Sequence, residues 1–444
     1  MARWSGATIE RTAGEAGRST RSAIHRPLAG LRAAIGRVGG PKSKSSDVGR
    51  EGGVDVESGF SGGGGAASVH RRDLHGADHD ARIGADAERI PPGHDSEGAR
   101  VAVLIASRNG EATIGDTIRS IATQAAGVYV VSDASTDRTA EVARAAGAQV
   151  IALATNVGKP AALHTLIASE RIIERYDFVT ILDDDTIVAD DFVAKSLAAF
   201  RDDVAIVTGR TESRRAHGRA RLNPLLASRA FAYWRYQVTL RRGQSALGVM
   251  NCISGSNSMF RSSILAKVVV ANTPYIVDDT FWTMEVQRRK LGKIVYAPGA
   301  VAAVCDPTNL RDWYKQNLRW LWGTCQGFIG HRVGSKPTLF DVTSVLLMLD
   351  WILYVFGAPL VLVLFMMHHP FTSFEHYVLF YAAGLGLWLT LASLATRRPE
   401  IVLMAPVIAL LDFVYRVIFI HAAIKAIRQP RVESCTWSSP KRYA

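Results

Sequence analysis

Cysteine is scarce in this sequence, and the cysteine pairs that bind zinc or build disulfide frameworks are missing. Its four cysteines, Cys252, Cys305, Cys325 and Cys435, form no C-x-x-C pair and show no Cys/His spacing of a metal site. This pattern argues against structural zinc and gives no sign of a disulfide scaffold. Scattered, reduced cysteines are typical of a domain that faces the cytoplasm.

Residues 1–98 lack any sustained apolar pattern. They are rich in Arg, Ser, Gly and Asp, with four consecutive glycines at 62–65. Such a segment cannot bury enough apolar surface to offset the entropy lost on ordering, so we predict a disordered polar arm. The apolar core of a secretory signal peptide is missing as well. A transit-like or membrane-surface arm is the alternative interpretation.

The formal net charge of +12 is carried almost entirely by the residues that follow this arm. A basic chain with apolar helices suits an anionic membrane face and substrates that carry phosphate. Nucleic-acid binding is the rival explanation of a basic chain. The sequence contains no recognisable nucleic-acid reader motif, so we expect no nucleic-acid partner.

Residues 99–335 alternate between short apolar runs and helical segments. The apolar runs lie at 101–106, 128–131, 149–152 and 178–182, and the helical segments near 112–124, 138–146 and 160–175. Strands that alternate with helices at this spacing predict βαβ units and an α/β domain with a mostly parallel sheet. Ligands bind such sheets beyond the carboxyl ends of the strands.

Residues 336–427 contain three long apolar stretches, at 342–366, 377–396 and 401–424. They predict a membrane region with two or three transmembrane helices, followed by a basic tail at 428–444. A soluble helix bundle is the alternative. In the third stretch Asp412 and Arg416 lie four residues apart, on one helical face, where they could pair.

The connections between these stretches differ in charge. The first, at 368–376, has no Lys or Arg, whereas the second contains Arg397 and Arg398. The positive-inside rule then places the catalytic domain in the cytoplasm of a multi-pass plasma-membrane protein. Three spans would leave the basic tail outside, against the same rule, so the third stretch is the best candidate for an interfacial or re-entrant helix.

Three adjacent carboxylates, Asp183, Asp184 and Asp185, directly follow an apolar strand. Clustered carboxylates repel one another, so their proximity is costly unless a cation is present. In an extended chain the side chains of Asp183 and Asp185 point the same way. Two carboxylates plus substrate phosphates suit Mg²⁺ or Mn²⁺, which would neutralise a departing nucleoside diphosphate. A solvated acidic turn is the alternative.

Two further sites follow neighbouring strands. Asp133 ends a strand, where a carboxylate can accept hydrogen bonds from a uracil ring or ribose; helix capping is the competing role. Lys159 follows Gly158 in a loop and offers a cation to phosphate. We therefore expect Asp133, Lys159 and Asp183 to contact the nucleotide.

Asp279, preceded by Asp278, is the candidate general base. A carboxylate near the sugar can take a proton from an attacking hydroxyl, and a neighbouring carboxylate helps to raise its pKa. Helix N-capping explains the same pair equally well locally.

The pentad from Gln316 to Trp320 reads Q-x-x-R-W, just before the apolar stretches. On a helix Gln316, Arg319 and Trp320 share one face. Trp320 could stack on a sugar ring and Arg319 could hold pyrophosphate. An aromatic and basic belt at the membrane interface is the alternative.

In this order the motifs resemble the processive family-2 glycosyltransferases, which make cellulose, chitin, hyaluronan and poly-N-acetylglucosamine. The matching elements are D-x-S-x-D at 133–137, N-x-G-K at 156–159, D-x-D at 183–185, G-x-x-x-x-F-R at 255–261, the T-E-D counterpart at 277–279 and Q-x-x-R-W at 316–320. The W-x-S-P ending of poly-N-acetylglucosamine synthases is similar to residues 437–440. Val277 and Asp278 depart from the family's Thr-Glu, and an arm replaces its usual preceding transmembrane helices.

The resemblance implies a GT-A-like domain that binds Mg²⁺ or Mn²⁺ and a UDP-sugar, with UDP-GlcNAc favoured by the ending. It implies Asp279 as the base, and Gly255, Ser256, Asn257 and Arg261 beside the acceptor together with Gln316, Arg319 and Trp320. The expected activity is inverting polymerisation and extrusion of a β-linked glycan across the bilayer, with a homo-oligomer or an accessory export subunit completing the path. Single transfer to a membrane lipid and an inactive membrane scaffold are the alternatives.

Overall fold

The computed structural model describes residues 98–216, 218–367 and 370–432. The predicted arm lies outside these residues apart from its last position, and so does the stretch from 433 to 444 that contains Cys435 and the W-x-S-P ending. The predicted domain boundaries, after residues 98, 335 and 427, stay predictions.

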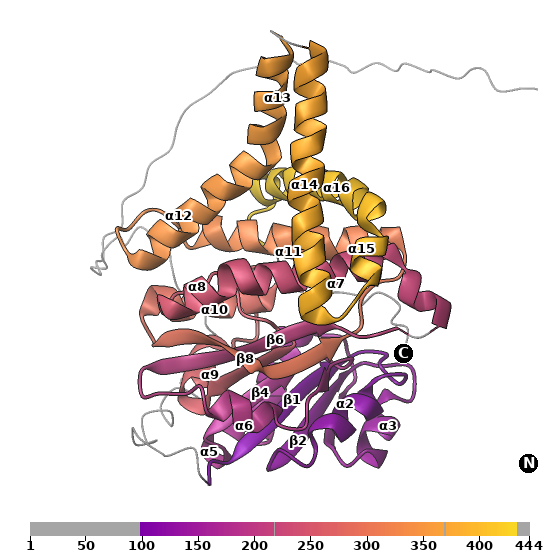
Figure 1. The fold of residues 1–444 in the computed structure, drawn as a ribbon. Coiled ribbons are helices and arrows are strands. Elements are labelled where there is room, and N and C mark those ends of the chain that lie inside the picture. The colour runs from indigo at the N-terminus through magenta and orange to yellow at the C-terminus, as the bar shows by residue number, and fades with distance from the viewer. Residues whose placement is uncertain (1–97, 217, 368–369, 433–444) are drawn as a thin grey trace, which may run out of the picture. The chain divides into compact units, whose positions relative to one another are not determined.

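Eight strands form one mixed sheet in the order β3-β2-β1-β4-β7-β6-β8-β5 (Figure 1). Strands β3, β2, β1 and β4 are mutually parallel, and so are β6 and β8. Strand β7 runs antiparallel to both of its neighbours, and β5 runs antiparallel to β8. The predicted α/β fold is confirmed. The strands are β1 Val101–Ser107, β2 Gly127–Asp133, β3 Gln149–Leu153, β4 Phe178–Leu182, β5 Ile187–Val188, β6 Val204–Ser213, β7 Asn257–Arg261 and β8 Lys293–Val304.

Helices cover both faces of the sheet, which explains why its central strands are continuously apolar. In β1, Leu104 packs into the cluster on one face while Val103 and Ile105 pack into the cluster on the other. One face is covered by α2 Ile114–Ile121, α3 Thr139–Ala145 and α6 Phe192–Leu197, and the other by α4 Lys159–Ser169, α5 Ile172–Arg175, α9 Ser262–Val268 and α10 Asp278–Arg289.

A second set of helices lies between the sheet and the apolar C-terminal region (Figure 1). Its longest members are α7 and α11, and α7 continues through a π-helical turn into α8. Glycine allows α11 to approach α10 closely: a Cβ added at Gly327 would lie 2.6 Å from Thr280 Cγ2, and one at Gly323 would overlap Val277. The elements are η2 Gly218–Leu222, α7 Pro224–Tyr236, η3 Gln237–Arg241, α8 Arg242–Ala246 and α11 Leu310–Gly330.

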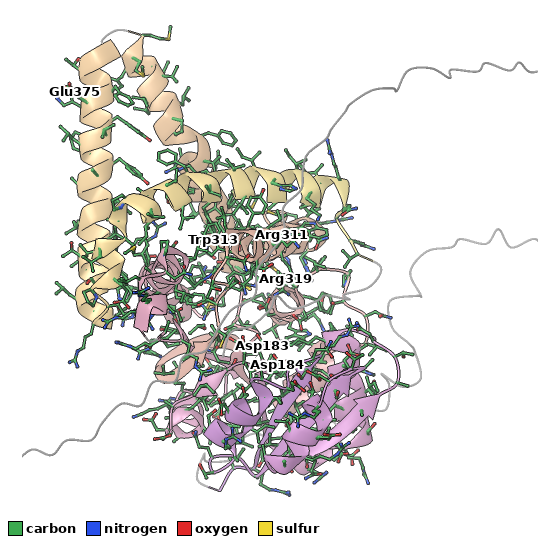
Figure 2. All side chains as sticks on the ribbon, turned by 90° about the vertical axis from the view of Figure 1, so that its right-hand side faces the viewer. Asp183, Asp184, Arg311, Trp313, Arg319 and Glu375 are labelled. Atoms are coloured by element: carbon green, nitrogen blue, oxygen red, sulfur yellow. The ribbon has the colours of Figure 1, made fainter. Side chains whose placement is uncertain are left out.

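Three helical stretches are long and apolar enough to cross a membrane: Leu339–Met366, Phe374–Thr396 and Ala405–Arg428. They comprise α12 Leu339–Ile352, η4 Leu353–Gly357, α13 Ala358–Met366, α14 Pro370–Thr396 and α16 Ala405–Arg428, with the short α15 Glu400–Leu403 before α16. Helices α13 and α14 stand side by side, whereas α16 packs along α11 and lies across α14 (Figures 1 and 2). Accordingly, 22% of an 18-residue apolar segment within Ala405–Arg428 is buried inside the protein, compared with 6% for the corresponding segment of Leu339–Met366.

The predicted pair of Asp412 and Arg416 is confirmed. The two side chains lie 3.1 Å apart, from Nη2 to Oδ2. The hydroxyls of Tyr354 and Tyr381 donate to the same carboxylate over 2.7 and 3.1 Å. The Asp412 carboxylate, which lies among apolar helices, is thus paired with a cation of its own helix and with two hydroxyl donors from other helices.

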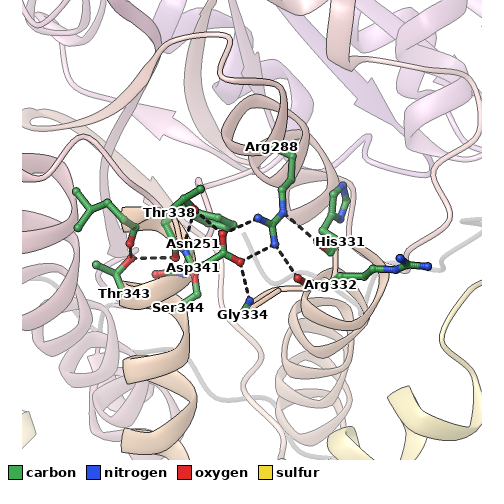
Figure 3. Close-up of polar contacts among 11 residues, drawn as sticks. Asn251, Arg288, His331, Arg332, Gly334, Thr338, Asp341, Thr343 and Ser344 are labelled. Atoms are coloured by element: carbon green, nitrogen blue, oxygen red, sulfur yellow. Dashed lines mark hydrogen bonds and ion pairs between the residues drawn. The ribbon is translucent and has the colours of Figure 1, made fainter. Parts of the chain in front are cut away.

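The first apolar stretch is tied to α10 by a buried ion pair (Figure 3). Arg288 donates through Nη1 and Nη2 to the two oxygens of Asp341, over 2.7 and 2.8 Å. The same guanidinium also donates to the carbonyls of His331 and Arg332. Since the Asp341 side chain is only 2% exposed, its charge depends on Arg288 for compensation.

Arg288→Gln is expected to lower the free energy of unfolding by about 3–5 kcal/mol, because it leaves the Asp341 carboxylate buried without its cation. The measurement is the melting temperature of the detergent-solubilised protein. Arg289→Gln is the matched control, since the neighbouring arginine is 43% exposed in its ion pair with Glu285. Equal melting temperatures for the two variants would contradict this account of the junction.

Candidate active site

The carboxyl ends of β1, β2 and β4 meet at one edge of the sheet because these strands are parallel. Ser107 ends β1 in register with Ser132, the neighbour of Asp133. Leu182, which is paired with Ile105 of β1, directly precedes Asp183. The sheet therefore brings the acidic clusters that follow β2 and β4 to the same edge, as the sequence predicted.

The middle carboxylate of the acidic triplet is turned inward. Asp184 accepts a hydrogen bond from the Ser107 hydroxyl over 2.6 Å, and its carbonyl accepts one from Thr117 over 3.0 Å. The residue at position 110 must be small here, because a Cβ on Gly110 would lie 2.5 Å from Asp184 Oδ2. Asp184 thus anchors the turn that holds Asp183 and Asp185, a role that the sequence did not distinguish.

Lys159 lies against the first carboxylate of the triplet. Its ammonium group is 2.6 Å from Asp183 Oδ1 and donates to the carbonyl of Gly255 over 3.2 Å. Burial alone would lower the pKa of Lys159, but the carboxylates of Asp183, Asp278 and Asp279 raise it above its ordinary value. The side chain therefore stays cationic at neutral pH, as a phosphate contact requires.

Asp183 and Asp185 have the donor chemistry that a hard divalent cation prefers. Within the described residues, no group of three or more His, Cys, Asp or Glu side chains could hold a metal ion. Two carboxylates with phosphate oxygens from a substrate are nevertheless a common Mg²⁺ arrangement. The residues present fit a substrate-completed metal site rather than a closed protein cage.

Asp133 binds the loop that begins α4. Its two carboxylate oxygens accept hydrogen bonds from the backbone amides of Val157 and Gly158, over 2.8 and 2.9 Å. Gly158 has φ of 84°, a conformation that favours glycine. Asp133 therefore sets the path of the backbone immediately before Lys159, and its predicted contact with the nucleotide stays a prediction.

Asp279 lies in the first turn of α10, which begins at Asp278. The Gly255 amide donates to its Oδ2 over 3.1 Å, and the Cys252 sulfur lies 3.6 Å from Oδ1. Burial and, to a smaller extent, the Asp278 carboxylate raise the pKa of Asp279 to about 6, although the charges of Lys159 and Arg319 lower it. A buried carboxylate with this pKa can accept a proton at neutral pH.

The predicted acceptor residues do not lie together, because they are at opposite ends of strand β7. Ser256 and Asn257 are buried near Asp279, and Gly255 touches that carboxylate directly; a Cβ on Gly255 would lie 2.9 Å from its Oδ2. Arg261 lies at the other end, where it pairs in register with Phe178 and donates to the carbonyls of Val204 and Arg201. The structure does not bring Arg261 to the other site residues.

Helix α11 carries the Q-x-x-R-W pentad. Arg319 lies on the side of α11 that faces Asp183 and Asp184 (Figure 2), and its positive charge lowers the pKa of Asp279. Gln316 and Trp320 contact Arg229 of α7: Gln316 Oε1 accepts a hydrogen bond over 2.8 Å, and the Trp320 ring centroid is 4.6 Å from the guanidinium carbon. Gln316 and Trp320 thus join α11 to α7, while Arg319 is directed toward the acidic residues of the site.

Sequence reasoning missed Arg229, Cys252 and the glycines of α11. The signal for Arg229 was present, since an arginine interrupts an apolar run within 224–236. Cys252 and the glycines gave none, because their contacts with Asp279 and with the start of α10 join distant parts of the chain.

The comparisons with known proteins agree with the motifs. The family model described as "Glycosyltransferase like family 2" matches residues 99–323. Poly-beta-1,6-N-acetyl-D-glucosamine synthase of Staphylococcus aureus strain COL is 26% identical over 250 residues, which cover 52% of this chain and 55% of that protein. The synthase of the same name from Staphylococcus epidermidis strain RP62A is 25% identical over 252 residues, with the same coverage. The chain spans about half the length of these relatives.

Among solved structures, glucosyl-3-phosphoglycerate synthase from Mycobacterium tuberculosis, in complex with Mg²⁺ and UDP, aligns with a TM-score of 0.37 and 17% identity. The alignment covers 57% of this chain and 83% of that one. The family match confirms the family resemblance inferred from the motifs.

Asp279→Asn is expected to stabilise the protein by about 3 kcal/mol at neutral pH, since the pKa of Asp279 rises from 3.8 to about 6 on folding. Below about pH 4 the carboxyl is protonated in both states, so the two proteins should be equally stable. Between these pKa values the unfolded state ionises first, and the wild-type protein loses stability as pH rises. Melting temperatures across this range test the sign; a variant that is less stable at neutral pH would contradict it.

Proposed function

The chain belongs to the family described as glycosyltransferase like family 2, and we propose that it polymerises a β-linked polysaccharide from a UDP-sugar at the plasma membrane. The observation that carries the proposal is the convergence on Asp279. Its buried carboxylate interacts with Lys159 at the start of α4 and with Arg319 of Q-x-x-R-W on α11, the helix that packs against the apolar α16. The residues proposed to bind the UDP-sugar, the proposed base and the helix that contacts the apolar region are therefore close together.

On the donor side we assign Asp133, Lys159 and Asp183 to the nucleotide. Asp183 and Asp185 would hold Mg²⁺ or Mn²⁺, which when bound neutralises negative charge on the leaving diphosphate. Lys159 supports this assignment because neighbouring carboxylates keep it protonated beside Asp183. Asp133 contributes by holding the Val157 and Gly158 amides that precede Lys159.

Asp279 is the general base of the proposed reaction. Its carboxylate takes the proton of an acceptor hydroxyl as that oxygen attacks the anomeric carbon of the sugar. A new carbon–oxygen bond forms on one face while the bond to the diphosphate breaks on the other, and UDP leaves with the bonding electrons. Attack opposite the leaving group inverts the anomeric centre and gives a β-linkage.

On the acceptor side we assign Gly255, Ser256, Asn257, Gln316, Arg319 and Trp320. Arg319 offers a cation to the diphosphate, and Trp320 offers an aromatic surface to a sugar ring. Gly255 places the backbone against the base, with its amide 3.1 Å from Asp279 Oδ2. We leave Arg261 out of the set, because it lies at the far end of β7.

We propose GlcNAc as the sugar because the matched relatives are named poly-beta-1,6-N-acetyl-D-glucosamine synthases. Extrusion is proposed because α11, which carries Q-x-x-R-W, packs directly on the apolar α16. The catalytic domain would face the cytoplasm, where UDP-sugars are made. A second copy of the chain or an accessory export subunit would complete the path across the bilayer.

The test uses membranes that contain the protein, with Mg²⁺ or Mn²⁺ and a panel of radiolabelled UDP-sugars, and sizes the products on a gel. High-molecular-weight label from one donor is expected, and it should disappear in Asp279→Asn while UDP binding remains. Asp202→Asn, an exposed carboxylate between α6 and β6, is the control and should transfer sugar as the wild type does.

Other products would select other functions. Label confined to a small product that partitions into organic solvent would identify transfer to a membrane lipid and end the polymerase proposal. No turnover with any donor would favour an inactive membrane scaffold. Full activity of Asp279→Asn would remove Asp279 from the role of base.

The rate of transfer should rise with pH through about 6 and then level off, because Asp279 acts in its ionised form and burial raises its pKa to that value. The measurement is kcat/KM for the UDP-sugar from about pH 5 to about pH 8. An acidic limb near the ordinary pKa of aspartate, about 4, would mean that another group controls the rate.

A further inference from the structure

Arg229 is a buried cation whose contacts converge on the Q-x-x-R-W pentad. It lies on α7 and is 4% exposed. Nη2 donates to Gln316 Oε1 over 2.8 Å, and Nη1 donates to Asn317 Oδ1 over 2.9 Å. Its charge is balanced by Asp306, whose Oδ1 lies 3.2 Å from Nε. One rigid guanidinium therefore binds two consecutive side chains of α11.

These contacts determine which way the Gln316 amide faces. A guanidinium only donates hydrogen bonds, so the atom of Gln316 that faces Arg229 must be its carbonyl oxygen. The amide nitrogen is then turned away from Arg229. Among the described residues it makes no hydrogen bond, whereas the amide of Asn317 is used on both sides, since its Nδ2 donates to the carbonyl of Trp313 over 2.8 Å. Gln316 consequently presents two N–H donors and no acceptor to a ligand.

The same guanidinium fixes the aromatic residue of the pentad. Its central carbon lies 4.6 Å from the ring centroid of Trp320 and 5.7 Å from that of Tyr233. The Tyr233 hydroxyl in turn donates to Asp306 over 3.0 Å, which closes the network. A cation over one face of an indole ring favours a single orientation of that ring.

We propose that Arg229 is the positioning residue of the Q-x-x-R-W pentad. It holds Gln316 as a pure hydrogen-bond donor, which suits phosphate oxygens of the donor diphosphate, and it fixes the plane of Trp320. This inference rests on the proposed function, because it assigns the pentad to a UDP-sugar. A merely structural Arg229 would join α7 to α11 through the same contacts but would not affect UDP binding through Gln316.

Gln316→Glu separates these roles. The glutamate still accepts from Arg229, so the α7–α11 contact is kept or strengthened, but both N–H donors are lost. We expect a melting temperature at least equal to that of the wild type and a Kd for UDP, in Mg²⁺ or Mn²⁺, raised about 10- to 100-fold, the effect of losing a hydrogen bond to a charged group. Unchanged UDP binding by Gln316→Glu would overturn the proposal.

Arg229→Lys is the second test, because it keeps a cation for Asp306 but cannot make both hydrogen bonds to Gln316 and Asn317 of α11. It should weaken UDP binding about tenfold in the wild-type background and much less when combined with Gln316→Met, since Arg229 acts through Gln316. Equal effects in the two backgrounds would also overturn the proposal. Arg235→Lys, on the exposed side of the same helix, is the control and should bind UDP as the wild type does.

These measurements distinguish the failure of this inference from the failure of the proposed function. UDP binding needs no turnover, so the coupling between Arg229 and Gln316 can be measured whatever the acceptor is. Wild-type protein that binds no UDP would refute the proposed function and this inference together. Wild-type protein that binds UDP and makes polymer, with no coupling between the two positions, would refute only the inference.

Discussion

The contact between α10 and α11 is the constraint on which the candidate active site depends. Asp279 lies in the first turn of α10 and Arg319 lies on α11, so the spacing of these helices sets the distance between the carboxylate and the cation. Gly323 and Gly327 allow that spacing, because a Cβ at either position would meet the side chain of Val277 or Thr280. Larger residues there would move the Asp279 carboxylate away from the Arg319 cation, whose charge lowers its pKa.

Charge balance within the site follows from this arrangement. Asp183, Asp278 and Asp279 lie near Lys159 of α4, and Asp279 also interacts with Arg319 of α11. Neither set of charges could be buried alone, since desolvation of unpaired ions is costly. Together they keep Lys159 protonated while Asp279 remains able to exchange a proton near neutral pH.

The strand ends were predictable from sequence, and the contacts between distant segments were not. Asp133 and Asp183 follow apolar runs whose parallel pairing is implied by the βαβ pattern, so their common edge could be inferred. The direction of β7 could not be read from five residues, which is why Arg261 was grouped with Asn257 although they lie at opposite ends of that strand. Arg229 and Gln316 are 87 positions apart, and neither residue alone indicates its partner. The inward turn of Asp184 was hidden for the same reason, because Ser107 is 77 positions away.

Helix α10 has a second consequence, which concerns mechanics. Asp279 lies at one end of α10 and Arg288 at the other, where it donates to both carboxylate oxygens of Asp341 at the start of the first apolar stretch. A helix of 12 residues is a stiff rod about 18 Å long. Because Arg288 and Asp279 belong to the same short helix, a tilt of α12 would be transmitted through Asp341 and Arg288 to the Asp279 carboxylate. In the proposed membrane enzyme, a tilt of α12 in response to bilayer thickness would therefore reach Asp279 through α10.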